Sequence, residues 1–239
     1  MASIVVNQVS KSFGKKEVLK KISLTVEPGQ IYGLIGPSGS GKTTLVKIIV
    51  GMDQASEGTV QVLDTTVPNL SLLQNIGYMA QADALYTDLT GKENLAFFAS
   101  LFKLSKNEQK KRIAYAADLV NLTPDLKKRV EAYSGGMKRR LSLAVALIQD
   151  PQVLILDEPT VGIDPELRLS IWQELYRLKD EGKTILVTTH VMDEAEKCDR
   201  LAMVRDGVIL TSGTPAELKE QFGITSLEEV FLKAGGKMG

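Results

Sequence analysis

The chain has 239 residues, of which 44% are hydrophobic and 24% charged, enough for one large or two small packed units. Its 29 basic and 29 acidic residues leave no net charge, which argues against nucleic acid as a partner, since proteins that bind it usually carry a basic excess. No apolar run approaches the roughly 18 residues needed to span a bilayer, and the single cysteine, Cys198, excludes an internal disulfide.

The first 80 residues are predicted to be rich in strands. Short runs with alternating β-branched residues are separated by turn residues, and Pro28-Gly29 lies between two of them. The predicted strands cover residues 4–6, 22–26, 31–35, 58–63 and 76–79.

A glycine-rich segment lies between the predicted strand 31–35 and an apolar helical run at 45–50. It fits the pattern G-x-x-x-x-G-K-[ST] of a phosphate-binding loop. Glycines let backbone N–H groups turn toward phosphate oxygens, and the following helix adds its positive N-terminal end. Lys42 would supply a charge for the β- and γ-phosphates of a nucleotide, and Thr43 a hydroxyl for Mg²⁺. The expected nucleotide-binding residues are Gly36, Pro37, Ser38, Gly39, Ser40, Gly41, Lys42, Thr43 and Thr44.

Gln81 follows the predicted strand 76–79 after a single alanine. Its amide oxygen could bind Mg²⁺ or the attacking water. Because Gln81 also precedes the helical part of the chain, it is a candidate sensor that links the γ-phosphate to movement of those helices. From spacing alone a surface glutamine remains the alternative.

Residues 88–150 are predicted to contain only helices. Thr90 with Glu93, and Ser105 with Glu108, each form the capping-box pattern that begins a helix. Ser134 begins a third helix. The basic run 103–112 is predicted to be the solvated face of the second helix.

Ser134, Gly135 and Gly136 form a second anion-binding geometry, in which bare N–H groups and a serine hydroxyl stand at a helix N-terminus. One nucleotide cannot easily use both this turn and the loop 36–44 within a single subunit. A head-to-tail dimer with two-fold symmetry solves the problem, since each ATP then lies between the loop of one subunit and the Ser134 turn of the other.

The chain returns to alternating strands and helices after residue 150. The continuous apolar run 153–157 is typical of a strand buried on both faces of a parallel sheet. Asp164 and Pro165 are predicted to begin a helix that reaches Gly182. The remaining predicted elements are a strand at 184–188, a hairpin of 201–204 and 208–210 through Asp206-Gly207, and helices that begin at Thr214 and Ser226.

Three further candidate site residues lie at the ends of predicted buried strands: Asp157 as a Mg²⁺ ligand, and Glu158 and His190 as catalytic residues beside Gln81. Asp157 ends the run 153–157 and could hold Mg²⁺ through water, while Glu158 could polarise the water that attacks the γ-phosphate. His190, the only histidine, follows the strand at 184–188 after one threonine and could hydrogen-bond the γ-phosphate. Parallel strands bring their carboxyl ends to one edge, where ligands bind.

These motifs in their order resemble the nucleotide-binding subunit of an ABC transporter over nearly the whole chain. The order is GPSGSGKTT, Gln81, YSGGM, LILDEPT, VGID and His190. The resemblance implies that Phe13 stacks on adenine and that Asp164 contacts the opposite subunit. The family usually has Leu-Ser-Gly-Gly-Gln where this chain has Tyr-Ser-Gly-Gly-Met, so Met137 offers no polar side chain for a contact at that position. YSGGMKRR resembles an exporter-like subgroup of drug, antibiotic and lipid transporters.

The implied fold is an α/β P-loop NTPase (RecA-like) core with an N-terminal antiparallel β subdomain and an all-helical insertion. The expected division is one ABC ATPase domain, with residues 1–81 and 151–239 as the catalytic core and 82–150 as the insertion. The implied cofactors are ATP and Mg²⁺. The implied partners are separate transmembrane permease subunits, docked near Leu85 and Tyr86 at the cytoplasmic face of the membrane, and a second ATPase subunit, identical or homologous.

Two other functions stay open at this point. One is an ABC ATPase that acts on ribosomes, DNA or cluster assembly, which the single domain and short insertion disfavour. The other is a regulatory module that binds nucleotide without hydrolysing it, which the presence of Glu158 and His190 disfavours.

Overall fold

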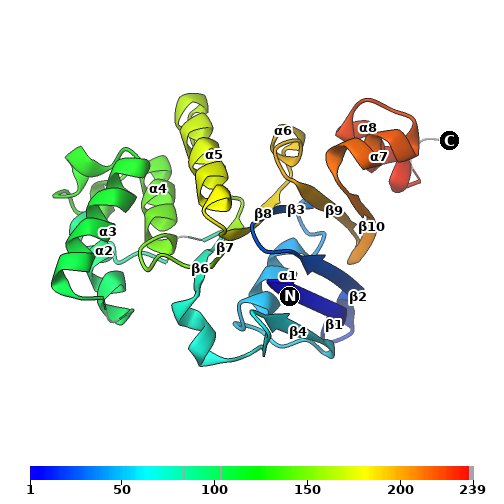
Figure 1. The fold of residues 1–239 in the computed structure, drawn as a ribbon, viewed down its shortest axis with the longest axis horizontal. Helices are drawn as coiled ribbons and strands as arrows, with labels where there is room; N and C mark the ends of the chain where they lie inside the picture. Colours follow the sequence, from blue (N-terminus) through cyan, green and yellow to red (C-terminus); the bar gives the residue numbers. More distant parts are fainter. Residues whose placement is uncertain (83, 103, 237–239) are drawn as a thin grey trace. The chain divides into compact units, whose positions relative to one another are not determined.

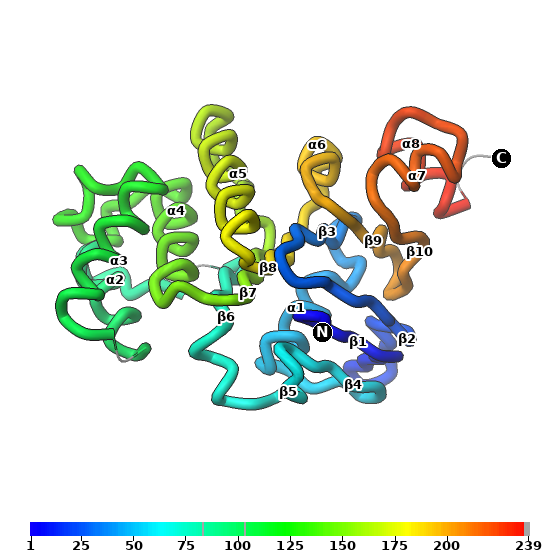
Figure 2. The backbone as a smooth tube through the Cα atoms, viewed as in Figure 1, coloured from blue at the N-terminus to red at the C-terminus, as the bar shows by residue number. Residues whose placement is uncertain are grey.

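Figures 1 and 2 show the computed structural model, which describes residues 1–82, 84–102 and 104–236. Residue contacts divide the chain into two compact units, Met1–Leu70 with Thr184–Gly239 and Ser71–Lys183. Each unit is described by itself. The division expected from the sequence, residues 1–81 with 151–239 and residues 82–150, places the boundaries elsewhere and stays a prediction.

The first unit contains an antiparallel sheet made almost entirely from the N-terminal residues. Its strand order is β2-β1-β4-β5, and each neighbouring pair is antiparallel. Figure 2 shows β1, β4 and the short β5 in the blue and cyan part of the chain, and β4 lies between β1 and β5 in the strand order. The strands are β1 (Ile4–Phe13), β2 (Lys16–Val26), β4 (Glu57–Val62) and β5 (Thr65–Thr66).

The same unit contains four strands of the second sheet, in the order β10-β9-β3-β8. β3 (Ile31–Ile35) is parallel to both β8 (Thr184–Thr189) and β9 (Arg200–Arg205), and all residues of β3 and β8 are buried. The predicted hairpin is confirmed, because β10 (Val208–Gly213) returns antiparallel to β9. Asp206 and Gly207 at its turn have φ values of 50° and 79°, as a two-residue turn requires.

Four helices belong to the first unit: α1 (Lys42–Ile49), α6 (Met192–Ala195), α7 (Pro215–Phe222) and α8 (Leu227–Ala234). Thr214 forms a full capping box at α7, and Ser226 caps α8 through the Glu228 N–H. Cys198 follows α6 and is buried, and this burial raises the pKa of its thiol to about 12.

The second unit pairs two parallel strands with a group of helices. β6 (Ile76–Met79) lies parallel to β7 (Val153–Asp157), whose five residues are all buried. Figure 1 shows α2, α3 and α4 side by side, in agreement with their contacts. The helical elements are the 3₁₀ turn Leu70–Gln74, which starts at the end of the first unit, α2 (Gly91–Leu101), α3 (Lys106–Leu119), the 3₁₀ turns Thr123–Asp125 and Val130–Ala132, α4 (Gly135–Ala146) and α5 (Pro165–Asp180).

The predicted helix starts in this unit are confirmed. Thr90 and Ser105 each form a complete capping box, with Glu93 and Glu108 as the reciprocal partners. Asp164 accepts a hydrogen bond from the Leu167 N–H at 2.9 Å and so caps α5. Such a cap stabilises a helix by about 1 kcal/mol. No helix in the described ranges has both the length and the hydropathy to cross a bilayer.

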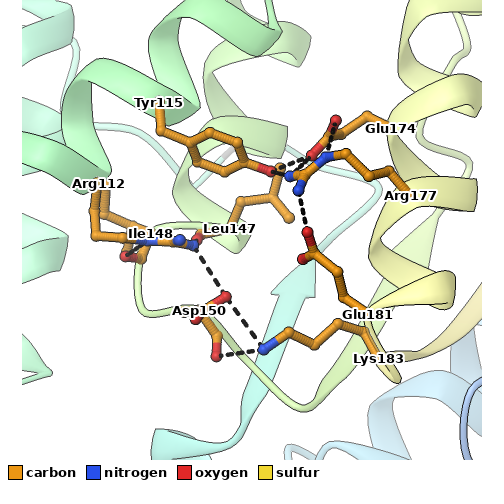
Figure 3. Close-up of polar contacts among 9 residues, drawn as sticks. All are labelled: Arg112, Tyr115, Leu147, Ile148, Asp150, Glu174, Arg177, Glu181 and Lys183. Carbon is orange, nitrogen blue, oxygen red and sulfur yellow. Dashed lines mark hydrogen bonds and ion pairs between the residues drawn. The ribbon is translucent and has the colours of Figure 1, made fainter.

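A polar network joins α3 to α5 (Figure 3). The Tyr115 hydroxyl donates a hydrogen bond to the Glu174 carboxylate and accepts one from Arg177 at 2.8 Å. Arg177 also pairs with Glu174 and Glu181. Burial, followed by the Glu174 carboxylate, raises the pKa of Tyr115, so the hydroxyl keeps its proton and can act as donor.

Arg112 corrects part of the prediction for the basic run. Lys106, Lys110 and Lys111 are exposed, as expected of a solvated helix face, and Lys103 lies outside the described residues. Arg112 instead turns inward and donates to the backbone carbonyls of Leu147 at 2.6 Å and Ile148 at 3.2 Å (Figure 3). Its guanidinium is needed there because the last turn of α4 leaves carbonyl groups without intrahelical partners.

Candidate functional site

The glycine-rich loop between β3 and α1 has the backbone of an anion-binding site. Gly41, the residue before α1, has a φ of 106°, which favours glycine, and a Cβ there would lie 2.7 Å from Leu19 Cδ2. At Gly36 a Cβ would lie 2.1 Å from the Val204 carbonyl oxygen. Since a glycine has no side chain to cap α1, the N–H groups of its first turn remain available to phosphate oxygens.

Lys42 lies across this loop. Its buried ammonium group donates to the carbonyl oxygens of Gly36 at 2.7 Å and Pro37 at 3.0 Å. Thr43 and Thr44 follow it in the first turn of α1 and are half-buried. The Ser40 hydroxyl is buried without a hydrogen-bond partner in the described chain, which fits a loop shaped to receive a polar ligand.

His190 lies next to the loop. The Gly36 N–H donates to the carbonyl oxygen of Thr189, the last residue of β8, at 3.3 Å. His190 is the next residue and is exposed. Within the first unit, the structure therefore places His190 near the start of the glycine-rich loop 36–44.

Phe13 ends β1 and presents an exposed ring. The side chain is 54% exposed, and the Lys11 ammonium lies 4.9 Å from the ring centroid. This contact with Lys11 leaves much of the ring open to solvent. An exposed aromatic face is suitable for stacking on a base.

In the second unit, Asp157 ends β7 and Glu158 follows it, and the two side chains lie in different environments. Asp157 is fully buried, while Glu158 is half-buried. Glu158 has a φ of 54°, in the left-handed region that a residue with a side chain seldom adopts. Backbone strain of this kind is concentrated at functional sites.

Arg139 connects the ends of β6 and β7. From α4, its guanidinium donates to the carbonyl oxygens of Ala80 at 2.7 Å, Gln81 at 3.0 Å and Glu158 at 2.7 Å, and also to that of Asp157. The structure thereby brings Gln81 and Glu158 to the same buried arginine. The sequence analysis did not single out Arg139, because three successive basic residues gave no sign of which one turns inward.

Ser134, Gly135 and Gly136 form the start of α4. The Ser134 hydroxyl oxygen accepts a hydrogen bond from the Met137 N–H at 3.2 Å, so the hydroxyl proton remains for an anion. Ser134 and Gly135 are exposed, and a Cβ on Gly135 would meet nothing within 4 Å. Asp164 is also exposed, at the start of α5.

Tyr133 stands where the resembling family usually has leucine. It is buried, and its hydroxyl donates to the Asp125 carbonyl oxygen at 2.9 Å. Burial raises the pKa of this hydroxyl. The side chain thus anchors the segment before Ser134 from inside the helical group and leaves the exposed turn unchanged.

The expected metal ligands of this chain suit Mg²⁺, which needs few protein ligands, better than a metal ion bound entirely by protein side chains. Among the described residues, no group of three or more histidine, cysteine, aspartate or glutamate side chains could hold a metal. Mg²⁺ commonly takes one or two carboxylates, with water and substrate phosphates as its other ligands. Of the residues expected to supply such oxygens, Thr43 lies in the first unit, whereas Gln81 and Asp157 lie in the second.

Comparison with known proteins gives one consistent result. A family model described as ABC transporter matches residues 19–161. The Nod factor export ATP-binding protein I of Rhizobium meliloti is 44% identical over 224 residues, which cover 92% of this chain and 67% of that protein. An ATP-binding subunit of an ABC transporter has a TM-score of 0.90 at 26% identity, with 97% of this chain and 99% of that chain covered.

A second solved structure is an ATP-binding cassette in a dimeric, post-hydrolysis state with ADP and phosphate bound. Its TM-score is 0.82 at 27% identity, and the match covers 88% of this chain and 98% of the other. The predicted P-loop NTPase fold is therefore confirmed, and the structural relatives include a cassette captured with the products of ATP hydrolysis.

Proposed function

The chain belongs to the ABC transporter family as an ATP-binding, ATP-hydrolysing subunit, and we propose that it powers export through separate permease subunits. Export is supported by relatives in several bacteria that are named Nod factor export ATP-binding proteins, at 40–44% identity. The observation that supports ATP binding in this chain is the loop before α1, with its uncapped helix start and the Lys42 ammonium. The substrate class is set by the permease.

We assign the loop residues 36–44 to the phosphates of ATP. Lys42 exchanges its carbonyl partners for the β- and γ-phosphate oxygens. The Thr43 hydroxyl, the Asp157 carboxylate and the Gln81 amide would hold Mg²⁺. When bound, Mg²⁺ neutralises negative charge on the phosphate oxygens. Glu158 accepts a proton from the attacking water, and His190 donates a hydrogen bond to the γ-phosphate.

The turn of Ser134, Gly135 and Gly136 acts on the nucleotide of a second subunit in this proposal. Its exposure and its free hydroxyl proton suit an incoming phosphate. Asp164 contacts the opposite subunit near that loop. A structurally similar bacterial cassette, 28% identical with a TM-score of 0.83, is a dimer. Both half-sites are present in this chain, so it can pair with itself or with a homologous subunit.

An apolar surface on α2 is proposed to contact the permease at the cytoplasmic face of the membrane. Tyr86, Phe97 and Leu101 are 49%, 36% and 56% exposed, and the rings of Tyr86 and Phe97 meet edge to face at 4.8 Å between centroids. The buried Asn94 side chain bonds both the N–H and the carbonyl of Tyr86, which fixes the segment on α2. Exposed apolar clusters of this kind are typical of protein interfaces.

Co-isolation from native membranes tests the transporter role. The tagged chain, purified after gentle solubilisation, should retain a protein with several membrane spans in stoichiometric amount, as mass spectrometry would show. Recovery with ribosomes, nucleic acid or assembly factors instead would support the alternative class of ABC ATPase and reject the permease.

Replacing Phe13 with alanine should weaken ATP binding by about 5- to 150-fold, since stacking of a base on an aromatic ring contributes about 1–3 kcal/mol. Phe13→Tyr retains a ring and should bind ATP nearly as the wild type does. Fluorescence titration with a labelled ATP gives both affinities. Equal affinities for Phe13→Ala and wild type would exclude a stacking role.

A further inference from the structure

We propose that Arg139 is a positioning residue for hydrolysis, which sets the geometry of Gln81 and Glu158 from α4, the helix that Ser134 caps. Its four carbonyl partners belong to Ala80 and Gln81 on one side and to Asp157 and Glu158 on the other. This inference rests on the roles proposed above for Gln81 and Glu158. It concerns Arg139, to which the proposed function assigns no role.

The chemistry of guanidinium suits this position. Nη1 donates to the Ala80–Gln81 pair and Nη2 to the Asp157–Glu158 pair, so one rigid plane sets the spacing between two chain segments. The side chain is only 7% exposed, so water cannot readily replace these donors. A lysine has a single ammonium at the end of a flexible chain and cannot hold both pairs in one plane.

The backbone of Glu158 makes this support necessary. A φ of 54° is costly for a residue with a side chain, and it persists only where neighbouring groups hold it. Arg139 binds the carbonyl oxygen of that same residue at 2.7 Å. The direction of the Glu158 carboxylate therefore depends on a donor that comes from α4.

The position of Arg139 in α4 also connects it to the turn of Ser134, Gly135 and Gly136. It lies in the second turn of the helix that starts at Gly135, and the Ser134 hydroxyl caps the same helix. Because the helix is rigid over this short distance, a shift of the Ser134 turn moves the donors that bind the carbonyls of Gln81 and Glu158. Contact between Ser134 and the partner's nucleotide is thus communicated to the catalytic residues of its own subunit.

The chain offers a matched control one residue away. Arg140 also donates to two backbone carbonyls, those of Val120 at 3.2 Å and Asn121 at 3.1 Å, but both lie at the end of α3. Arg139→Met and Arg140→Met remove the same side chain from the same helix. Both variants should unfold at a lower temperature than the wild type.

The experiment measures ATP affinity, kcat and KM for the purified chain, well below the melting temperature of each variant. Arg139→Met should lower kcat by about 100-fold, with KM and ATP affinity within about threefold of wild type, since a misplacement of about 1 Å can cost that much. Arg139→Lys should recover part of the loss, because it restores the charge and some donors. Arg140→Met should keep the wild-type kcat.

Each outcome decides the matter. A normal kcat in a folded Arg139→Met, or an equal loss in Arg140→Met, would overturn the positioning role. If Arg139→Met does not fold, Arg139→Lys decides alone, and a wild-type kcat there rejects the inference. Glu158→Gln in the same assay separates the two levels: full activity of that variant rejects the proposed catalytic role, whereas an inactive Glu158→Gln beside active Arg139 variants rejects only this inference.

Discussion

Glu158→Gln should bind ATP with wild-type affinity and hydrolyse it at least about 100-fold more slowly. An amide cannot accept a proton from the attacking water, and a general base contributes about 10²- to 10⁴-fold to a rate. The substitution keeps the shape of the side chain, so the unusual backbone at φ 54° and the hydrogen bond from Arg139 remain. ATP should therefore persist in the dimer. Phosphate release and size-exclusion chromatography in Mg·ATP measure the two effects.

Glu220→Gln is the matched control, since Glu220 is exposed on α7 and makes the same change of charge away from the site. It should hydrolyse ATP as the wild type does. Hydrolysis by Glu158→Gln at the wild-type rate would remove Glu158 from the catalytic role. If Glu158→Gln stays monomeric in Mg·ATP, the expected ATP-bound dimer is contradicted, but the role of Glu158 in hydrolysis is not.

Lys42→Ala should lose ATP affinity by at least about tenfold and fall below detectable hydrolysis. A charge-assisted hydrogen bond contributes about 1.5–3 kcal/mol, and the ammonium of Lys42 is placed to make more than one with the phosphates. The buried site offers little water to replace it, since Lys42 is 5% exposed. Calorimetric titration with ATP in the presence of Mg²⁺ gives the change in affinity.

Lys47→Ala, on the exposed face of the same helix, removes one positive charge without touching the loop and should bind ATP normally. Because Lys42 also bonds two loop carbonyls, the melting temperature of Lys42→Ala without nucleotide must be compared with the wild type. Unchanged affinity in a folded Lys42→Ala would contradict the assignment of the loop to phosphate binding.

The features predicted most reliably from the sequence are those set by nearby residues. The capping boxes at Thr90 and Ser105, the buried strand at Val153–Asp157 and the turn at Asp206-Gly207 each arise from residues a few positions apart. The glycine-rich loop before α1 is of the same kind, since its glycines, Lys42 and α1 are consecutive in the chain. Local chemistry leaves few alternatives at such positions.

The features that the sequence did not reveal depend on residues distant in the chain. Arg139 meets Gln81 58 positions earlier, and Tyr115 meets Glu174 59 positions later. In the sequence Arg112 is one of several cations on a predicted solvated helix face, and its contact with the carbonyls at the end of α4 exists only in the folded chain. The left-handed backbone of Glu158 has no marker such as glycine. Only tertiary structure determines these contacts.

The hydrogen bonds and ion pairs between Tyr115, Glu174 and Arg177 have a mechanical consequence. α5 starts beside Asp164, and Glu174 lies ten residues further, about 15 Å along the helix. A displacement of Asp164 is therefore transmitted along α5 and, through the contacts of Tyr115, to α3. The two helices are then expected to move together. Arg177 and Glu181 have side chains 47% and 48% exposed, so dissolved ions screen their ion pair. Added salt should therefore weaken the Arg177–Glu181 pair more than the contacts of Glu174, whose side chain is 14% exposed.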